Sequence, residues 1–155
     1  MSFKDEVWNT REATLGDIAE TAFEHNYGPN SGWQWERYGL NRPRVSMFNI
    51  DPFVRYTPDY LLEGPDGTVR LVEVQGCGRD GLFKFKDDKI DALLDWHYQT
   101  NARGEVVHVW LWDEIHSRCW LVPIFGLIKL LEKHGQPGQF PEGKPYIAIH
   151  IEHLD

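Results

Sequence analysis

The chain is poor in cysteine and has no long apolar run, and each deficit excludes a class of protein. Its two cysteines, Cys77 and Cys119, are too few for a four-cysteine zinc or iron–sulfur site, and their contexts do not resemble a disulfide framework. The longest apolar run, residues 120–131, is too short to span a bilayer and is interrupted by Lys129. The opening residues, MSFKDEVWNT, lack an apolar signal region. We therefore expect a protein of the reducing cytoplasm that does not enter a membrane.

Basic residues are also scarce, since 16 Lys and Arg stand against 24 Asp and Glu and the formal net charge is −8. This balance excludes a surface that is basic all over, although it is compatible with a local basic cluster. Apolar material is plentiful, because hydrophobic residues make up 41 % of the chain and aromatic residues 14 %. We therefore expect residues 1–155 to form one domain whose core folds without disulfides or metals.

Three common site motifs are missing. None of the seven histidines has the His-x-x-x-His or the Cys/His spacing of a zinc site. The chain has no Gly-x-Ser-x-Gly and no P-loop, so serine hydrolysis and NTP hydrolysis lack support.

The apolar periodicity that is present predicts alternating helices and strands. Thr14 and Asp17 have the spacing of a capping box, and residues 33–39 form either a short helix or an irregular segment. Helices are expected at Leu15–His25, Leu82–Thr100 and Pro123–Gly135, and strands at Val45–Ile50, on both sides of a turn near residue 66, and at Val106–Trp112, Arg118–Val122 and Pro145–Glu152. This order predicts an α/β fold with a mixed central sheet flanked by helices.

The turn near residue 66 determines the register of a predicted hairpin. Gly64-Pro65-Asp66-Gly67 suits a three-residue loop, in which a type I turn is followed by a left-handed glycine that forms a bulge. Residues 64 and 68 then flank the loop, so Asp59 is expected directly opposite Glu73 on one face of the hairpin. Gln75 is expected one step further along the same face.

Two opposed carboxylates have a chemical consequence. Their Cβ atoms would lie roughly 4.5–5.5 Å apart, and the charges would repel each other unless a cation lay between them. A hard divalent ion such as Mg²⁺ takes oxygen ligands of this kind, lowers the pKa of a bound water and polarises a phosphate. The alternative interpretation is that both acids are solvent-facing strand residues.

These residues resemble the PD-(D/E)XK nuclease superfamily, which has the restriction-endonuclease-like fold. Pro58-Asp59 matches its PD, and Glu73-Val74-Gln75 matches its (D/E)-x-K except at the last position. Residues 16–20 are similar to the first-helix Gly-x-x-x-Glu of archaeal Holliday-junction resolvases, and residues 56–60 to a strand of TnsA-type transposition endonucleases. The resemblance covers residues 14 to about 112. It implies a core of order α-β-β-β-α-β, followed here by a C-terminal strand-helix-strand extension.

The resemblance also implies roles for individual residues. Asp59 and Glu73 would be metal ligands, the Val74 carbonyl a third, and Glu20 a ligand or the residue that orients a metal-bound water. Gln75 stands where the family usually has Lys, and an amide can hydrogen-bond but carries no charge. Lys89 or Lys86 of the following helix is the candidate to supply that charge.

Several basic residues are candidates for contacts with DNA. Arg37, Arg42 and Arg44 lie among aromatic residues in the sequence, and Lys84 and Lys86 follow the acidic site. Basic residues interleaved with aromatics can hold a nucleic-acid backbone or stack on an unpaired base. The alternative is that these cations cover aromatic core residues or form a solvated helix face.

The segment Gly76–Gly81 offers a competing interpretation, because it spells Gly-x-Gly-x-x-Gly between a predicted strand and a predicted helix. That is the setting of a dinucleotide-binding turn. Against it, the strand carries Glu73 and Gln75 near its end, and no acid ends a following strand about 20 residues later.

The sequence and the resemblance together predict an endonuclease that cleaves DNA with Mg²⁺ or Mn²⁺, with branched DNA such as Holliday junctions as a candidate substrate. A small nuclease of this kind often works as a dimer, so a homodimer is the expected assembly. A compact chain of this type suits a bacteriophage or a mobile element. The alternatives are a nucleic-acid-binding or assembly module that has lost catalysis, and a nucleotide-binding protein that uses the Gly76–Gly81 loop.

Overall fold

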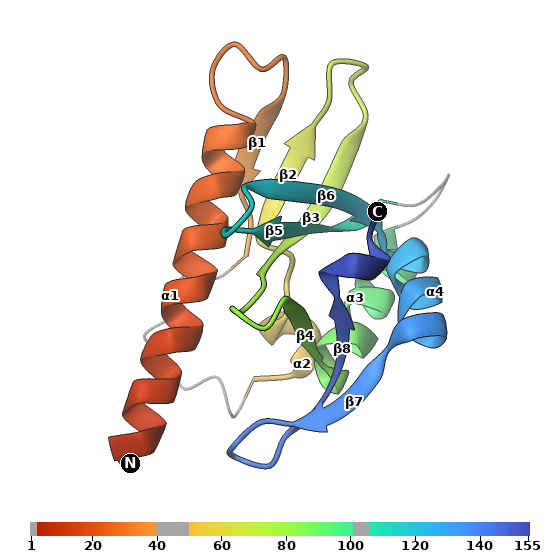
Figure 1. The fold of residues 1–155 in the computed structure, drawn as a ribbon. Helices are drawn as coiled ribbons and strands as arrows, with labels where there is room; N and C mark the ends of the chain where they lie inside the picture. Colours follow the sequence, from red (N-terminus) through yellow and green to blue (C-terminus); the bar gives the residue numbers. More distant parts are fainter. Residues whose placement is uncertain (1–2, 40–49, 101–105) are drawn as a thin grey trace.

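The computed structural model describes the backbone of residues 3–39, 50–100 and 106–155, and the side chains of these residues from 15 onward (Figure 1). The helices are α1 (Phe3–Asn26), α2 (Pro52–Arg55), α3 (Asp87–Thr100) and α4 (Ile124–His134), with a final 3₁₀ turn at Ile151–His153. The strands are β1 (Gln34–Arg37), β2 (Tyr60–Glu63), β3 (Val69–Gly76), β4 (Leu82–Lys86), β5 (Val107–Asp113), β6 (Arg118–Pro123), β7 (Gln136–Gln139) and β8 (Pro145–His150). The protein thus has the α/β fold, with a mixed sheet flanked by helices, that the sequence predicts.

The main sheet has five strands in the order β1-β2-β3-β5-β6. β3 and β5 run parallel, and the other neighbouring pairs run antiparallel. The connection from β3 to its parallel neighbour β5 passes through β4 and α3, as a parallel pair requires a crossover. This crossover returns α3 to the neighbourhood of β3.

A second, three-stranded sheet has the order β4-β8-β7 and is antiparallel throughout. Phe83 and Phe85 of β4 alternate with lysines and are fully buried, while Ile149 lies opposite Phe83 on β8. The strand period of two therefore turns one face of this sheet into the core.

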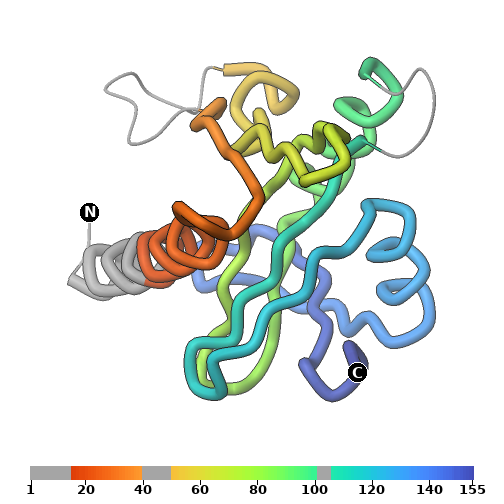
Figure 2. The backbone as a smooth tube through the Cα atoms, turned by 90° about the horizontal axis from the view of Figure 1, so that it is seen from above, coloured from red at the N-terminus to blue at the C-terminus, as the bar shows by residue number. Residues whose placement is uncertain are grey.

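The two faces of the main sheet pack against different partners (Figure 2). On one face, Ala19 and Phe23 of α1 pack against Tyr60, Val72 and Trp110. The other face supplies a second core that includes residues of α3, α4 and the second sheet. β5 lies between these two cores and is buried on both faces, which explains its nearly continuous apolar sequence.

The predicted hairpin has the predicted register. Tyr60 pairs with Val72 and Glu63 with Val69, so partners sum to 132, which extrapolates to Asp59 opposite Glu73. The Gly64 N–H donates to the Thr68 carbonyl, and Gly67 has a φ of 81°. A left-handed residue at this point favours glycine, and it closes the loop in the expected way.

Other predicted elements are also confirmed. The apolar central strand is β5, the strand that follows it is β6, and the third helix lies between Pro123 and Gly135 as α4. The last strand is β8, although it ends at His150 and Ile151 begins a 3₁₀ turn.

Three local predictions are wrong, and one strand was missed. α1 begins at Phe3 rather than at Leu15, so Thr14 and Asp17 lie inside the helix and do not form a capping box at its start. Residues 34–37 form the edge strand β1 rather than a helix or an irregular segment. Residues 82–86 form β4 rather than the first turn of a helix, and β7 was not expected. The strand predicted at 45–50 lies, apart from Ile50, outside the described residues.

The described helices contain no segment both long enough and apolar enough to cross a bilayer.

Candidate active site

Two carboxylates face each other where β2 begins beside β3. Asp59 immediately precedes β2, and its Oδ2 accepts a hydrogen bond of 2.9 Å from the Val74 N–H of β3. Glu73 immediately precedes Val74 on β3 and is only 6 % exposed. The β-strand alternation that buries Val72 and Val74 against α1 turns Glu73 and Gln75 toward α3.

The paired carboxylates perturb each other. Burial and the neighbouring Glu73 raise the pKa of Asp59 to about 8, although Lys89 and the Val74 N–H oppose the rise. Burial also raises the pKa of Glu73, and Lys89 opposes that rise. Glu73 Oε2 is buried and accepts no hydrogen bond from the residues that the structure describes. Two acids held this close, one with an unsatisfied oxygen, form a site that favours a shared proton or a cation.

Lys89 approaches this pair from α3. Its Nζ lies 2.9 Å from Glu73 Oε1 and 3.0 Å from Gln75 Oε1. The structure therefore places a cation beside the amide at the position where the resemblance expects a lysine side chain. Of the two lysines proposed for that charge, Lys89 reaches the site, whereas Lys86 lies on β4 with its Nζ over the Phe140 ring.

Gln75 connects the site to the second sheet. Its Nε2 donates a 3.3 Å hydrogen bond to the Lys84 carbonyl, while its Oε1 accepts from Lys89. Both ends of the amide are engaged, so its orientation is determined by its partners. Gln75 thus helps to position the Lys89 ammonium group, in addition to being a candidate to contact a ligand.

Glu20 lies at the margin of the site. α1 approaches β3 closely, since a Cβ at Gly76 would lie 3.1 Å from the Leu15 carbonyl oxygen. Burial and the nearby Asp59 raise the pKa of Glu20, whose Oε2 also lies 3.7 Å from Arg37 Nη1. Glu20 is therefore electrostatically coupled to the pair, and its place as a ligand stays a prediction.

The Val74 carbonyl lies on the side of β3 that faces Asp59. The N–H and C=O of one residue in an antiparallel ladder point to the same neighbouring strand. Since the Val74 N–H binds Asp59, its carbonyl faces the β2 side as well. Its role as a metal ligand stays a prediction.

Sequence reasoning missed a set of contacts behind the site. Tyr56 Oη donates to Asp88 Oδ1 at 3.1 Å, and Arg55 Nη2 donates to Asp88 Oδ2 at 3.1 Å. Burial and Asp88 raise the pKa of Tyr56 to about 12, so it stays a protonated donor. These contacts join the end of α2 to the residue before Lys89 and hold the start of α3 against α2. The residues are 32 and 33 positions apart, and no short-range pattern signals the pairing.

The candidate DNA-binding residues are dispersed. Arg37 forms ion pairs with Glu20 and Glu24 and lies over the Tyr60 ring. Lys84 and Lys86 lie on the second sheet, and Lys84 Nζ is 3.3 Å from Asp80 Oδ2. Arg42 and Arg44 lie outside the described residues.

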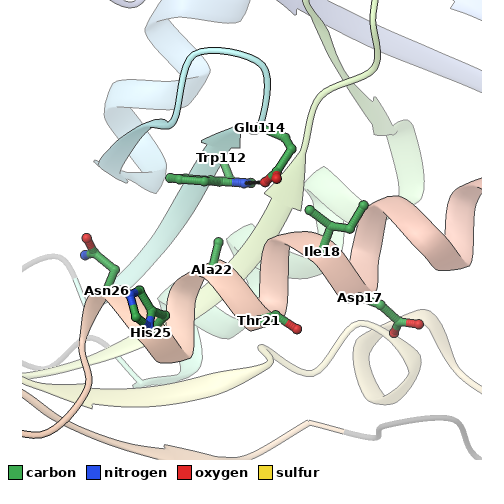
Figure 3. Close-up of a pocket in the computed structure, with 8 residues that line it drawn as sticks. All are labelled: Asp17, Ile18, Thr21, Ala22, His25, Asn26, Trp112 and Glu114. Atoms are coloured by element: carbon green, nitrogen blue, oxygen red, sulfur yellow. Dashed lines mark hydrogen bonds between the residues drawn. The ribbon is translucent and has the colours of Figure 1, made fainter.

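A hollow of about 590 Å³ is lined by side chains of α1 and by Trp112 and Glu114, and neither Asp59 nor Glu73 lines it (Figure 3). Ile18 and Ala22 of α1 point toward the Trp112 ring, whose Nε1 donates to Glu114 Oε2 at 2.5 Å. Asp17 and Glu114 also line this hollow, which makes it unfavourable for a phosphate.

The Gly76–Gly81 segment does not have the setting of a dinucleotide-binding turn. It is followed by β4, not by a helix, so it lacks the helix N-terminus on which a pyrophosphate is bound. Cys77 in this loop is buried, and Gly81 packs on the His150 ring. The prediction of a helix after this loop was wrong, and the nucleotide-binding alternative loses its structural basis.

The donor set fits a hard divalent cation in part. The available atoms are carboxylate oxygens, and Glu73 Oε2 has an unsatisfied lone pair. Within the described part of the chain, no three His, Cys, Asp or Glu side chains converge as a ready-made metal cage. A bound ion would therefore complete its shell with water, backbone or substrate oxygens, as Mg²⁺ commonly does.

No protein-family model and no curated protein sequence matches the chain. Among solved structures, it is similar to D212, a nuclease from a fusselovirus, with 8 % sequence identity and a TM-score of 0.43. The match covers 91 % of this chain and 84 % of that one. At this identity and TM-score we infer nothing about activity from the similarity.

Proposed function

We propose that the protein is a metal-dependent DNA endonuclease that hydrolyses phosphodiester bonds, with Asp59 and Glu73 as its central acids. One observation carries the proposal: two opposed carboxylates, one of them buried with an oxygen that lacks a hydrogen-bond partner among the described residues, lie beside a lysine supplied by another element. Such an arrangement costs stability in the folded protein. Residues that store this cost are typical of sites that bind a cation or catalyse a reaction.

Asp59 and Glu73 would hold Mg²⁺ or Mn²⁺, with Glu20 and the Val74 carbonyl as further candidates. The ion, when bound, would lower the pKa of a water and polarise the phosphate. The two carboxylates repel other anions, so the position between them is where a cation would bind. The pairing with Val74 limits the freedom of Asp59, so it can hold an ion in one orientation.

Lys89 and Gln75 would act on the substrate rather than on the ion. A lysine at 2.9 Å from Glu73 carries the charge that can stabilise a phosphate as negative charge accumulates on it. Gln75 holds the ammonium group through its Oε1 and is the second candidate to contact the attacking water or the phosphate. This division of labour accounts for a glutamine at position 75, since the charge comes from α3.

Branched DNA as the substrate and a homodimer as the active assembly belong to the same proposal. They are supported by the resemblance of residues 16–20 to junction resolvases and by the need to bring two sites to two strands. Glu20, the last residue of that segment, lies on α1 within electrostatic reach of Asp59.

The test is cleavage of labelled duplex, single-stranded and four-way-junction DNA with Mg²⁺, Mn²⁺ or EDTA. We expect metal-dependent cleavage by the wild type and its loss, by at least about 100-fold, in Asp59→Asn and in Glu73→Gln. Asp95→Asn, which changes an exposed acid on α3, is the matched control and should cut normally. Cleavage that survives both site substitutions would refute the assignment.

A second candidate is a DNA-binding or assembly module without catalysis. It is favoured by the Lys89–Glu73 ion pair, which already compensates one buried carboxylate, and by the absence of a third converging acid among the described residues. DNA binding that is intact in the wild type, with no cleavage of any of the three substrates in any metal, would establish this candidate instead.

A further inference from the structure

The second sheet presents a face that the catalytic proposal does not use. Phe83 and Phe85 of β4 point into the core, so Lys84 and Lys86 point to the opposite face. In the register of this sheet, Lys86 lies opposite Tyr146 of β8, and Tyr146 lies opposite Gly138 of β7. The Cα atoms of the two lysines are about 6.6 Å apart along the strand.

Aromatic rings hold both lysines in place. Lys84 Nζ lies 5.5 Å from the centre of the Tyr146 ring, and Lys86 Nζ lies 5.6 Å from the centre of the Phe140 ring. Tyr146 and Phe140 also contact each other, with 4.8 Å between their centres. Gly138 leaves room for this arrangement, since a Cβ there would be 2.4 Å from Tyr146 Cζ. Cation–π contacts of this kind order a lysine without neutralising its charge.

This face is joined directly to the candidate active site. Gln75 Nε2 donates to the Lys84 carbonyl at 3.3 Å, and Lys86 is the last residue before α3. Lys89, one helical turn further on, reaches Glu73. Lys84, Lys86 and Lys89 therefore follow one another along the chain from the second sheet to the paired carboxylates.

The acids near this face do not cancel its charge. Asp80 pairs with Lys84 at 3.3 Å, but its side chain is 47 % exposed. Exposed ion pairs of this type contribute little to stability, so a phosphate can replace the carboxylate. Glu142, in the turn after Phe140, is exposed as well.

We propose that the Lys84–Lys86 face binds the phosphodiester backbone of the nucleic-acid strand on one side of the scissile bond. This inference rests on the proposed function, because it assigns the path of the substrate that Asp59 and Glu73 would cut. The contacts are made to phosphates and not to base edges, so they position the strand without reading its sequence. Although the chain has a net charge of −8, the two lysines give this face a local positive charge that attracts a polyanion.

The experiment measures binding separately from cleavage. Fluorescence anisotropy of labelled duplex DNA, in Ca²⁺ or EDTA and over a series of NaCl concentrations, is compared for the wild type, K84Q/K86Q and K129Q/K133Q. The last variant removes two exposed lysines from α4 and is the matched control. K84R/K86R keeps the charges and tests whether charge or packing matters.

We expect K84Q/K86Q to bind about 10-fold more weakly, on DNA of any sequence, and to lower the slope of log K against log salt by about 1.8, since each phosphate contact contributes about 0.9. K129Q/K133Q should match the wild type, and K84R/K86R should keep the slope. An unchanged slope in K84Q/K86Q, or an equal loss in K129Q/K133Q, would overturn the inference.

These binding data, set beside the cleavage assay described above, separate the inference from the proposed function. If the wild type binds with the expected dependence on Lys84 and Lys86 but cuts nothing, the binding face stands and the endonuclease proposal fails. If the wild type cuts DNA and K84Q/K86Q binds as tightly as it does, the endonuclease proposal stands and the binding face is refuted.

Discussion

Replacing Asp59 by asparagine should make the metal-free protein more stable while abolishing cleavage. The amide oxygen of the new side chain could still accept the hydrogen bond from the Val74 N–H, so the packing of the hairpin is retained. Once Asp59 is ionised, at a pH above its raised pKa, the substitution removes one of two opposed charges whose carriers lie roughly 5 Å apart. At an effective dielectric constant of about 20, this repulsion is worth about 3 kcal/mol.

The pKa of Asp59 gives the pH dependence of this effect. Burial and Glu73 raise it to about 8, against roughly 4 in an unfolded chain. A carboxyl with a raised pKa stabilises the fold below its unfolded pKa, and this stabilisation is lost as the pH rises through the folded pKa. The advantage of Asp59→Asn should therefore be small near pH 4, grow between pH 4 and 8, and reach about 2–3 kcal/mol near pH 7.

The assay is urea and thermal denaturation in EDTA at several pH values, followed by tryptophan fluorescence. At pH 7 the variant should melt about 4–12 °C above the wild type, given roughly 2–4 °C per kcal/mol for a chain of this size. Added Mg²⁺ or Mn²⁺ should stabilise the wild type and not the variant. Asp95→Asn, which changes an exposed acid, should stay within about 0.5 kcal/mol of the wild type at every pH. A variant less stable than the wild type at pH 7, or a difference that does not change with pH, would refute the opposition of Asp59 and Glu73.

Two further predictions test other charges in the fold. Lys89→Met leaves the buried Glu73 carboxylate uncompensated and should destabilise the protein by about 3 kcal/mol in urea denaturation. Lys89→Arg should restore part of this loss, and equal stability of Lys89→Met and the wild type would contradict the 2.9 Å ion pair. Asp113→Asn should cost about 2–3 kcal/mol at pH 7, because the buried Asp113 carboxylate accepts a 2.7 Å hydrogen bond from His116 and a 3.5 Å bond from Arg118. Burial alone would raise the pKa of Asp113, but the hydrogen bonds from His116 and Arg118 hold this pKa below its ordinary value. The contribution of the Asp113 carboxylate to stability should therefore vanish as the pH falls below about 4. If Asp113→Asn still destabilised the protein in full far below the ordinary pKa of an aspartate, this account would be contradicted.

The hairpin shows how much local chemistry can predict. A glycine with positive φ at residue 67 and a proline at residue 65 define the loop, and the loop defines which residues face each other. No distant contact is needed to bring Asp59 opposite Glu73. The apolar sequence of β5 is equally informative, because a strand covered on both faces cannot alternate with polar residues.

The incorrect predictions share a physical cause. α1 extends to Phe3 although Thr14 and Asp17 have the spacing of a helix start, since a capping motif is only a weak local preference. β1 and β4 are short strands of four and five residues, and each exists because a neighbouring strand pairs with it. Pairing partners that are far away in the sequence leave no periodic signal in so short a segment.

The class of the fold, the register of the hairpin and the opposition of two acids are readable in the sequence, because each follows from the spacing of nearby residues. Which lysine meets those acids depends instead on how distant segments pack. Lys86 and Lys89 are similarly close to Glu73 in the chain, but Lys86 lies on the second sheet and Lys89 on α3, which the crossover from β3 to β5 packs against the hairpin. The anchoring of that helix by Tyr56, Arg55 and Asp88 likewise depends on chain segments that meet only after folding.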